Sequence, residues 1–368
     1  MRAVLIGGGH AHVHVLKHFG TRRLPGVEVT LIGRDVRTPY SGMIPGFVAG
    51  CYSFEECHID LAALCTRTGA HLIQGEATGI DRAGRQVLLK DQPPVAYDVL
   101  SVDVGSAPDL DAVPGAADWA IPVKPIADLG RRWLDFVERM KSWLGPLDIV
   151  VIGGGAGGVE LALAIDHHLR RAAKGAHLQV TLATKGEILA GHAKAARRRL
   201  WTIFHRRGLR LLENNAARRI ERGAVKLADG TWQHADAVFV VTEASAAPWF
   251  ATTGLPLDER GFLAVGDTLQ STGDPLIFAA GDCATMVNQR RPKAGVFAVR
   301  QGPPLARNLE RTLAGQAPEP FHPQERYLAI IGTGDGSAVA TRGRWAIEGH
   351  WVWLLKDYID RRWMNVYR

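Results

Sequence analysis

A glycine-rich turn in the middle of the chain has the spacing that cofactor phosphates require. Gly153, Gly155 and Gly158 complete the pattern G-x-G-x-x-G directly after an apolar run. The first glycine permits a tight turn, the second lets backbone N–H groups approach a pyrophosphate, and the third lets the following helix pack closely on a strand. Because the pattern stands between an expected strand and an expected helix, it predicts a dinucleotide site.

A second turn of the same kind begins almost at the first residue. Gly7 and Gly9 match the start of the pattern, but His12 stands where the third glycine is expected. We therefore expect the helix to lie further from its strand or to bend, with the pyrophosphate cradle retained around His10 and Ala11. The two turns together predict two dinucleotide sites in one chain.

Three histidines share one face of the helix expected after the first turn. His10, His14 and His18 recur every four residues. A metal site would also need a carboxylate or thiolate nearby, and the sequence nominates none. We interpret this face as a partly exposed helix surface with His10 near the cofactor phosphates, and we predict no metal site.

The residues that would meet the two riboses differ between the units. A Rossmann unit usually ends its second strand with an acid that binds the ribose diol. In the first unit the candidate is Asp35, two residues after Gly33. In the second unit the strand leads to Lys185, which can donate to a 2'-phosphate but cannot accept from a 2'-hydroxyl, and this favours NADPH. A solvated Lys185 in a weakly selective site is the alternative, so NADH and NADPH both stay open.

Strands and helices in a fixed order must position these turns. In the first unit we expect a strand at 2–6, a helix at 10–19 with Gly20 as its C-cap, and a strand at 27–32. In the second unit we expect a strand at 148–152, a helix at 159–171 and a strand at 178–182. The predicted fold class is therefore α/β, with two Rossmann-like dinucleotide-binding domains and a small C-terminal extension.

Composition narrows the class of protein. The 368 residues carry a net charge of +7 and contain no apolar run near the ~20 residues that a membrane span needs. The first apolar run begins almost at the initial Met and leaves no room for a signal peptide, so we expect a cytoplasmic protein.

Arginines gather at 197–210, where Trp201, Ile203 and Phe204 are the expected buried side of a helix. We interpret this run as a solvated basic face and predict no nucleic-acid partner.

The run LIFAAGD at 276–282 resembles the closing FAD motif of the pyridine-nucleotide-dependent flavin oxidoreductases. The resemblance implies that Gly281 and Asp282 belong to an FAD site, with Asp282 on the ribityl chain. We assign Gly105, near the first crossing between domains, to the same site. The FAD-binding domain is then expected in two parts, at 1–112 and 249–315, with an NAD(P)H-binding domain at 113–248 between them. A linker and a C-terminal extension with an amphipathic helix are expected at 316–368.

Longer segments resemble the type II NADH dehydrogenases, and especially the dehydrogenase-like module fused to selenide, water dikinase. These segments are GGGHAH (7–12), TPYSGMIPGFVAG (38–50), IPVKPI (121–126) and RPKAGVFAVRQGP (291–303). The dikinase itself has no counterpart here, so selenophosphate synthesis is not implied.

This resemblance implies an arrangement of the flavin and an electron path. The flavin is expected between Ser41-Gly42-Met43 and the helix around Lys293 to Gln301. Hydride would pass from NAD(P)H to FAD, and electrons would leave to a small acceptor such as a quinone. The protein then supplies position and electrostatics rather than a dedicated acid. Glu160 is the candidate near the nicotinamide, and an acid that favours the helix dipole in the first helical turn is an equal interpretation.

The acceptor stays open because this sequence departs from the type II pattern. Gly295 and Arg300 replace two glutamines that meet the quinone in that pattern, and only Gln301 remains. A thiol or disulfide reductase acting through Cys51 or Cys57 is one alternative. A flavin-binding sensor or interaction module without turnover is another.

The tail ends in an aromatic and basic helix. Its apolar residues recur at helical spacing and are Trp351, Leu355, Tyr358, Ile359, Trp363 and Val366. Such a helix can lie at an anionic bilayer surface, which would place the protein on the inner face of a membrane and favour a quinone acceptor. A helix docked on the protein's own core is the alternative, which Asp357 and Asp360 favour because they dilute the basic charge.

Overall fold

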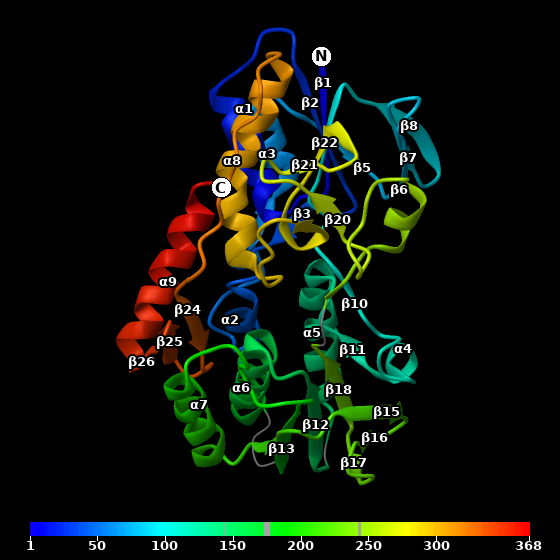
Figure 1. The fold of residues 1–368 in the computed structure, drawn as a ribbon. Coiled ribbons are helices and arrows are strands. Elements are labelled where there is room, and N and C mark those ends of the chain that lie inside the picture. Colours follow the sequence, from blue (N-terminus) through cyan, green and yellow to red (C-terminus); the bar gives the residue numbers. More distant parts are fainter. Residues whose placement is uncertain (144, 173–176, 242–243) are drawn as a thin grey trace.

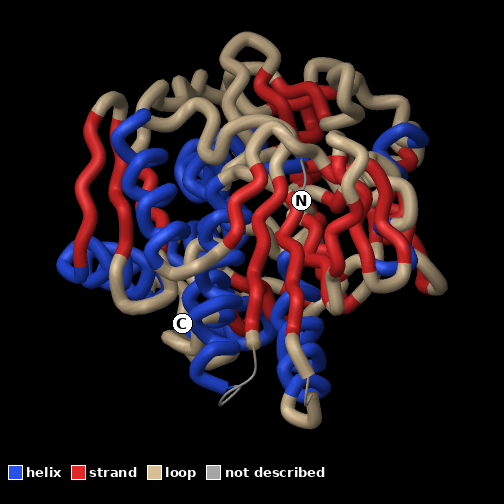
Figure 2. The backbone as a smooth tube through the Cα atoms, turned by 90° about the horizontal axis from the view of Figure 1, so that it is seen from below, coloured by secondary structure: helices blue, strands red, loops and turns tan. Residues whose placement is uncertain are grey.

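The computed structural model describes residues 1–143, 145–172, 177–241 and 244–368. Two sheets of mostly parallel strands lie one above the other, and the C-terminal tail runs along their side (Figure 1). Viewed from below, the strands form layers with helices packed beside them (Figure 2). The α/β prediction with two Rossmann-like units is confirmed.

The first sheet draws its strands from both ends of the chain. Its order is β23 (Ala284–Met286), β20 (Leu263–Val265), β21 (Gln270–Ser271), β22 (Asp274–Ala279), β9 (Val99–Val102), β1 (Arg2–Ile6), β2 (Glu28–Gly33) and β5 (His71–Gln74). The five strands from β22 to β5 are parallel, and the central strands β9 and β1 are apolar and almost wholly buried, as strands covered on both faces should be. Helices α1 (His10–Thr21), α3 (Leu61–Thr68) and α8 (Gly295–Leu313) pack together beside it.

Shorter elements complete this half of the molecule. They are β3 (Arg37–Pro39), paired with β4 (His58–Asp60); α2 (Ile44–Val48); η1 (Glu55–Cys57); η3 (Gly281–Cys283); and a three-stranded sheet of β6 (Ala77–Asp81), β7 (Gln86–Leu89) and β8 (Gln92–Ala96).

The second sheet comes from the middle of the chain and is wholly parallel. Its order is β11 (Ile121–Pro122), β18 (Ala237–Val240), β12 (Leu147–Ile152), β13 (Leu178–Ala183) and β14 (Arg210–Leu212). Its helices are α4 (Ala116–Trp119), α5 (Ile126–Met140), α6 (Ala156–Ala172) and α7 (Lys194–Arg206), and a small sheet holds β15 (Ala217–Glu221), β16 (Ala224–Leu227) and β17 (Trp232–His234). The two crossings between the large sheets pair as β10 (Ala107–Pro108) and β19 (Ala244–Ser245), and η2 (Pro248–Thr252) follows.

The tail forms a unit that the sequence only partly predicts. The expected helix is present as α9 (His350–Asn365), but an unforeseen antiparallel sheet of β24 (Ala329–Gly332), β25 (Ala338–Arg342) and β26 (Trp345–Gly349) precedes it. This sheet packs against α6 and α7. Arg207, just after α7, binds the buried Asp166 of α6 at 2.7 Å and the Thr333 carbonyl at 2.6 Å. The tail is therefore attached to the helices of the second sheet.

Two local predictions are wrong. Gly20 does not end α1, which continues to Thr21. Glycine is needed there for another reason: a Cβ at Gly20 would lie 2.6 Å from the Thr68 side chain, so its absence lets α3 pack closely on α1. Trp201, expected on the buried side of α7, is 51% exposed. The buried side consists of Ala196, Leu200, Ile203 and Phe204. Trp201 follows Leu200 directly, so its side chain points about 100° around the helix axis from that of Leu200 and away from the core.

Candidate cofactor and active site

The first glycine turn joins the end of β1 to the start of α1. Gly7 has a φ of +92°, and a Cβ there would lie 2.4 Å from the Asp103 carbonyl oxygen. A Cβ at Gly9 would lie 2.2 Å from the Asp103 carboxylate. Gly105, with a φ of +71°, faces open space. The turn thus needs its glycines and leaves room for a ligand beside Gly105, so these residues fit a dinucleotide.

His12 takes the place of the third glycine without interrupting the helix. Its imidazole is fully buried and contacts the Gly7 carbonyl at 2.7 Å and the Ser101 hydroxyl of β9 at 2.8 Å. Burial lowers the pKa of His12 to about 4, so the ring is neutral near pH 7. The imidazole ring fills the space between α1 and the strands below it, where a glycine would let the helix pack more closely.

Asp103 is a site residue that the sequence reasoning missed. Its carboxylate accepts hydrogen bonds from the backbone N–H groups of Ala11 (2.8 Å) and His12 (3.2 Å) at the start of α1. Only 2% of its surface is exposed, and burial raises its pKa to about 7. Its position directly after the buried strand β9, at the edge where cofactors bind in such sheets, is the signal that could have found it.

The histidine face of α1 is partly exposed, as expected, and its three side chains contact other elements. His10 lies beside Ser41, whose hydroxyl is 3.2 Å from its Nε2. His14 reaches the Tyr367 hydroxyl at 3.2 Å, and His18 pairs with Glu310 of α8 at 2.7 Å. Burial lowers the pKa of His10 to about 4. Contacts with the tail and with α8, which the sequence could not place, account for this face.

The second half of the proposed FAD site lies in η3. Gly281 has a φ of +72°, and its N–H donates to the Gln301 side-chain oxygen at 2.7 Å. The Asp282 carboxylate lies 3.3 Å from the Ser106 hydroxyl and 3.4 Å from the Lys124 ammonium. Gln301 therefore holds this turn, and Lys124 is a second residue that the sequence reasoning did not single out.

The two segments expected on either side of the flavin meet in the structure. A Cβ at Gly295, the first residue of α8, would lie 2.6 Å from the Ser41 hydroxyl oxygen, so the missing side chain allows this approach. Met43 is buried at the start of α2. The Lys293 ammonium is bound to the Thr285 hydroxyl at 2.8 Å and lies 4.0 Å from the centre of the Phe262 ring. Burial lowers the pKa of Lys293.

The C-terminal helix contributes a buried cation to the same place. The Lys356 ammonium donates to the Gly42 carbonyl and to Asp360, each at 2.6 Å. The Trp363 ring stacks on Tyr40 with 4.2 Å between ring centres. Burial alone would lower the pKa of Lys356, but the carboxylates of Asp360 and Glu160 outweigh it and raise the pKa. A helix outside both dinucleotide-binding units therefore completes the segment around Gly42.

Glu160 of α6 faces this cation from the second unit. Its Oε1 accepts the Gly332 N–H of β24 at 2.7 Å. Burial raises the pKa of Glu160 to about 7, although Lys356 acts in the opposite direction. The residue is half-buried and can hold or release a proton near neutral pH. Glu160 thus lies where the second unit, the tail and the Gly42 segment converge.

The second glycine turn is built as its spacing requires. Gly153 has a φ of +127°, and a Cβ there would lie 2.3 Å from the Val241 carbonyl oxygen. A Cβ at Gly158 would lie 1.9 Å from the Gly153 carbonyl oxygen, so the helix and strand touch there. Gly155 faces open space, and its backbone can be approached by a ligand. These residues fit a second dinucleotide.

The ribose candidates have different surroundings. Asp35 forms ion pairs with Arg34 at 2.9 Å and Arg131 at 3.8 Å, so its carboxylate is partly engaged. Lys185 lies two residues beyond the end of β13 and is exposed. Its ammonium is placed to meet a ligand at that edge of the sheet or to remain in solvent.

Sequence comparison supplies the family. A model of the pyridine nucleotide-disulphide oxidoreductase family matches residues 1–302. This chain belongs to that family. Its members in this group use FAD and NAD(P)H, and the chain is an oxidoreductase with these cofactors.

Known relatives of this oxidoreductase are distant but span nearly the whole chain. The NADH dehydrogenase-like protein YutJ of Bacillus subtilis is 25% identical over 347 residues, which cover 90% of this chain and 89% of YutJ. Demethylphylloquinone reductase NdbB of Synechocystis is 25% identical over 366 residues, 93% of this chain and 87% of that protein. The sulfide:quinone oxidoreductase of Aquifex aeolicus has the same fold, with a TM-score of 0.83, 18% identity, and coverage of 99% of this chain and 92% of that one.

The cysteines of this oxidoreductase are poorly suited to thiol chemistry. Cys57 is buried, its sulfur lies 3.3 Å from two backbone carbonyls, and burial raises its pKa to about 12. Burial also raises the pKa of Cys51. All four cysteines are free. Because the thiolate is the reactive form, the alternative of a thiol or disulfide reductase is disfavoured.

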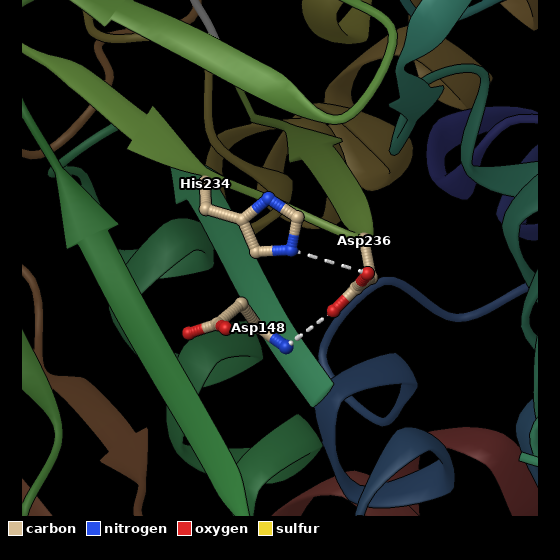
Figure 3. Close-up of side chains that lie close together, drawn as sticks. All are labelled: Asp148, His234 and Asp236. Atoms are coloured by element: carbon tan, nitrogen blue, oxygen red, sulfur yellow. Dashed lines mark hydrogen bonds and ion pairs between the residues drawn. The ribbon is translucent and has the colours of Figure 1, made fainter. Parts of the chain in front are cut away.

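One group of side chains has the composition of a metal site, although none is predicted from the sequence. Asp148 of β12, His234 at the end of β17 in the small sheet, and Asp236 just before β18 lie together (Figure 3). Asp236 is already engaged, since it accepts the Asp148 N–H at 2.8 Å and lies 3.4 Å from the His234 ring nitrogen. These contacts at the start of β12 join it to the segment that leads into β18.

We expect Lys356→Met to weaken both the fold and flavin retention. The substitution leaves Asp360 buried without its cation, which typically costs about 3–5 kcal/mol of unfolding free energy. Urea unfolding of the purified protein and fluorescence of released flavin measure the two effects. Lys356→Met/Asp360→Asn should recover much of the stability while the flavin stays loosely held. Lys141→Met, at a lysine that is 67% exposed, is the matched control and should change neither. Unchanged stability and flavin content in Lys356→Met would contradict this role.

Proposed function

We propose that this protein passes hydride from NAD(P)H to FAD and electrons onward to a quinone. In this proposal residues 1–112 and 249–315 bind FAD and residues 113–248 bind NAD(P)H. Bound FAD supplies the redox chemistry, since a flavin can accept a hydride and release its two electrons to an acceptor. The observation that carries the proposal is the convergence of Glu160, Lys356 and Gly42, which brings the helix of the second glycine turn to the segment expected beside the flavin.

The residues of this chain would have distinct tasks. The glycine turns at Gly7 and Gly153 would bind the two pyrophosphates at the starts of α1 and α6. Lys356 would hold the Gly42 backbone in place and contribute positive charge there. Glu160, whose pKa is raised to about 7, would hold or release a proton where the two units meet.

Two observations support a quinone as the acceptor. The first is the relative from Synechocystis, which is named a demethylphylloquinone reductase. The second is the outer stripe of α9, formed by exposed apolar residues at helical spacing: Trp351, Leu354, Leu355, Tyr358 and Ile359. The opposite side of α9 is buried against the protein, through Val352, Lys356, Asp360 and Met364. The helix is thus docked on the core and also presents an apolar surface.

We propose that the outer stripe rests on a bilayer and gives access to a lipid-soluble acceptor. No helix within the described stretches has both the length and the apolar character needed to cross a membrane. Aromatic rings at headgroup depth with nearby basic side chains are typical of interfacial helices, and Arg362 continues the stripe. Membrane contact would then be peripheral and on the inner face.

Anaerobic stopped-flow spectroscopy tests the electron path. Reduction by NADH or NADPH should bleach the flavin, and a soluble quinone should restore its absorbance faster than a disulfide does. Cys51→Ser and Cys57→Ser should leave both phases unchanged, because neither thiol takes part. Failure of both nucleotides to reduce the flavin would instead favour a flavin-binding sensor. Faster reoxidation by a disulfide, lost in a cysteine variant, would favour the thiol reductase.

The choice of nucleotide is tested at Lys185. We expect Lys185→Glu to shift the preference toward NADH, because a carboxylate accepts from the 2'-hydroxyl and repels the 2'-phosphate. The ratio of flavin-reduction efficiencies should change by about tenfold or more, since a charge-assisted hydrogen bond contributes about 1.5–3 kcal/mol. Lys194→Glu, an equal change of charge at another exposed lysine, is the control. An equal shift in both variants would mean that Lys185 does not contact the nucleotide.

Membrane contact is tested by flotation with anionic phosphatidylglycerol vesicles. Replacing Trp351, Leu354 and Tyr358 by serine should abolish flotation without unfolding the protein, since these side chains are 55%, 52% and 60% exposed. Replacing Trp119 and Trp232, which are 49% and 48% exposed on other elements, should leave flotation unchanged. If the triple variant floats as the wild type does, the outer stripe is not a membrane surface.

A further inference from the structure

The carboxylate of Asp103 occupies backbone donors that a cofactor pyrophosphate would use. The starts of helices after such glycine turns bind phosphate through backbone N–H groups and the helix dipole. Here the N–H groups of Ala11 and His12 already donate to Asp103, at 2.8 Å and 3.2 Å. Two glycines of the proposed FAD site, Gly9 and Gly281, both face this carboxylate, since a Cβ on either would lie within 2.5 Å of it.

The charges around Asp103 do not favour a second anion. Its hydrogen bonds within the described chain come from backbone groups, and no lysine or arginine there forms an ion pair with it. Asp282, on η3, adds negative charge nearby. The other titratable group that interacts with it is Cys283 on η3, and Lys293 in turn interacts with Cys283 and Asp282. The His12 ring is directed at Gly7 and Ser101 instead. A pyrophosphate bound at this turn would therefore lie near a buried carboxylate that has no ion-pair partner among the described residues.

We propose that Asp103 couples FAD binding to the uptake of one proton. The ionised side chain holds the start of α1 in the free protein, and on binding it takes a proton from solvent and becomes the neutral acid. The neutral acid can still accept an N–H through its carbonyl oxygen and can donate its O–H to a phosphate oxygen. One proton is consumed for each FAD bound, and no electron moves. This inference rests on the proposed function, because it assumes that FAD occupies the first glycine turn.

The pH dependence has a definite sign. Burial raises the pKa of Asp103 to about 7, so the side chain is already neutral below that pH and must gain a proton above it. The dissociation constant for FAD should therefore be constant below about pH 7 and rise about tenfold per pH unit above it. His12, with a pKa lowered to about 4, and Cys283, with a pKa raised to about 12, do not titrate in this range.

The experiment measures FAD release from the diluted flavoprotein by flavin fluorescence, between about pH 6 and pH 9. Asp103→Asn mimics the neutral acid and should bind FAD with the low-pH affinity of the wild type at every pH. Asp282→Asn should weaken binding and keep the wild-type slope, but the slope should begin at a lower pH because the charge of Asp282 helps to raise the pKa of Asp103. A wild-type affinity that does not vary with pH, or an Asp103→Asn variant with the wild-type slope, would overturn the inference.

A second measurement remains decisive if Asp103→Asn fails to fold. Calorimetry of FAD binding to the wild type, at about pH 8 in two buffers with different ionisation heats, gives the number of protons taken up. A value near one supports the inference, and a value near zero refutes it. FAD binding without proton uptake would leave the proposed function intact, whereas a protein that binds no FAD at any pH would refute the proposed function itself.

Discussion

A buried ammonium group joins the separate parts of this protein. Lys356, near the C-terminus, binds the Gly42 carbonyl of the first unit and Asp360 of its own helix, and it faces Glu160 of the second unit. A buried cation is tolerated only when it is paired and hydrogen-bonded, so these partners must stay together. The positions of α9, of the Gly42 segment and of α6 relative to one another all depend on this constraint.

The same constraint explains why the tail belongs to the site. In sequence the tail follows a proline-rich linker and lies outside the segments that resemble dinucleotide-binding domains. In the structure its sheet binds Glu160 through Gly332, and Arg207 after α7 binds Thr333. Its C-terminal end contacts the histidine face of α1 through Trp363 of α9 and through Tyr367 just beyond it. Neither large unit would present the same surface to a flavin without these contacts.

Two acids with pKa values raised to about 7, one buried and one half-buried, mark the ends of the proposed site. Asp103 lies at the first glycine turn, and Glu160 lies where the two units meet. Burial is the main cause in both cases, but their surroundings differ. Glu160 faces a lysine, whereas Asp103 faces another acid and is held by backbone N–H groups. The first arrangement suits proton exchange during turnover, and the second ties protonation to occupancy of the glycine turn.

The sequence by itself determined the α/β class, the two glycine turns and the units around them. These features are local, because a turn that needs a positive φ or a close approach requires glycine at fixed spacing, as Gly7, Gly153 and Gly158 show. The resemblance of longer segments added the family and its cofactors. Only the tertiary structure decided the roles of Asp103, Lys124 and Lys356, because each acts on residues far away in the chain. It also decided that Gln301 holds Gly281 and that α9 has one docked and one open face, since burial depends on which elements pack together and not on the residue's own type.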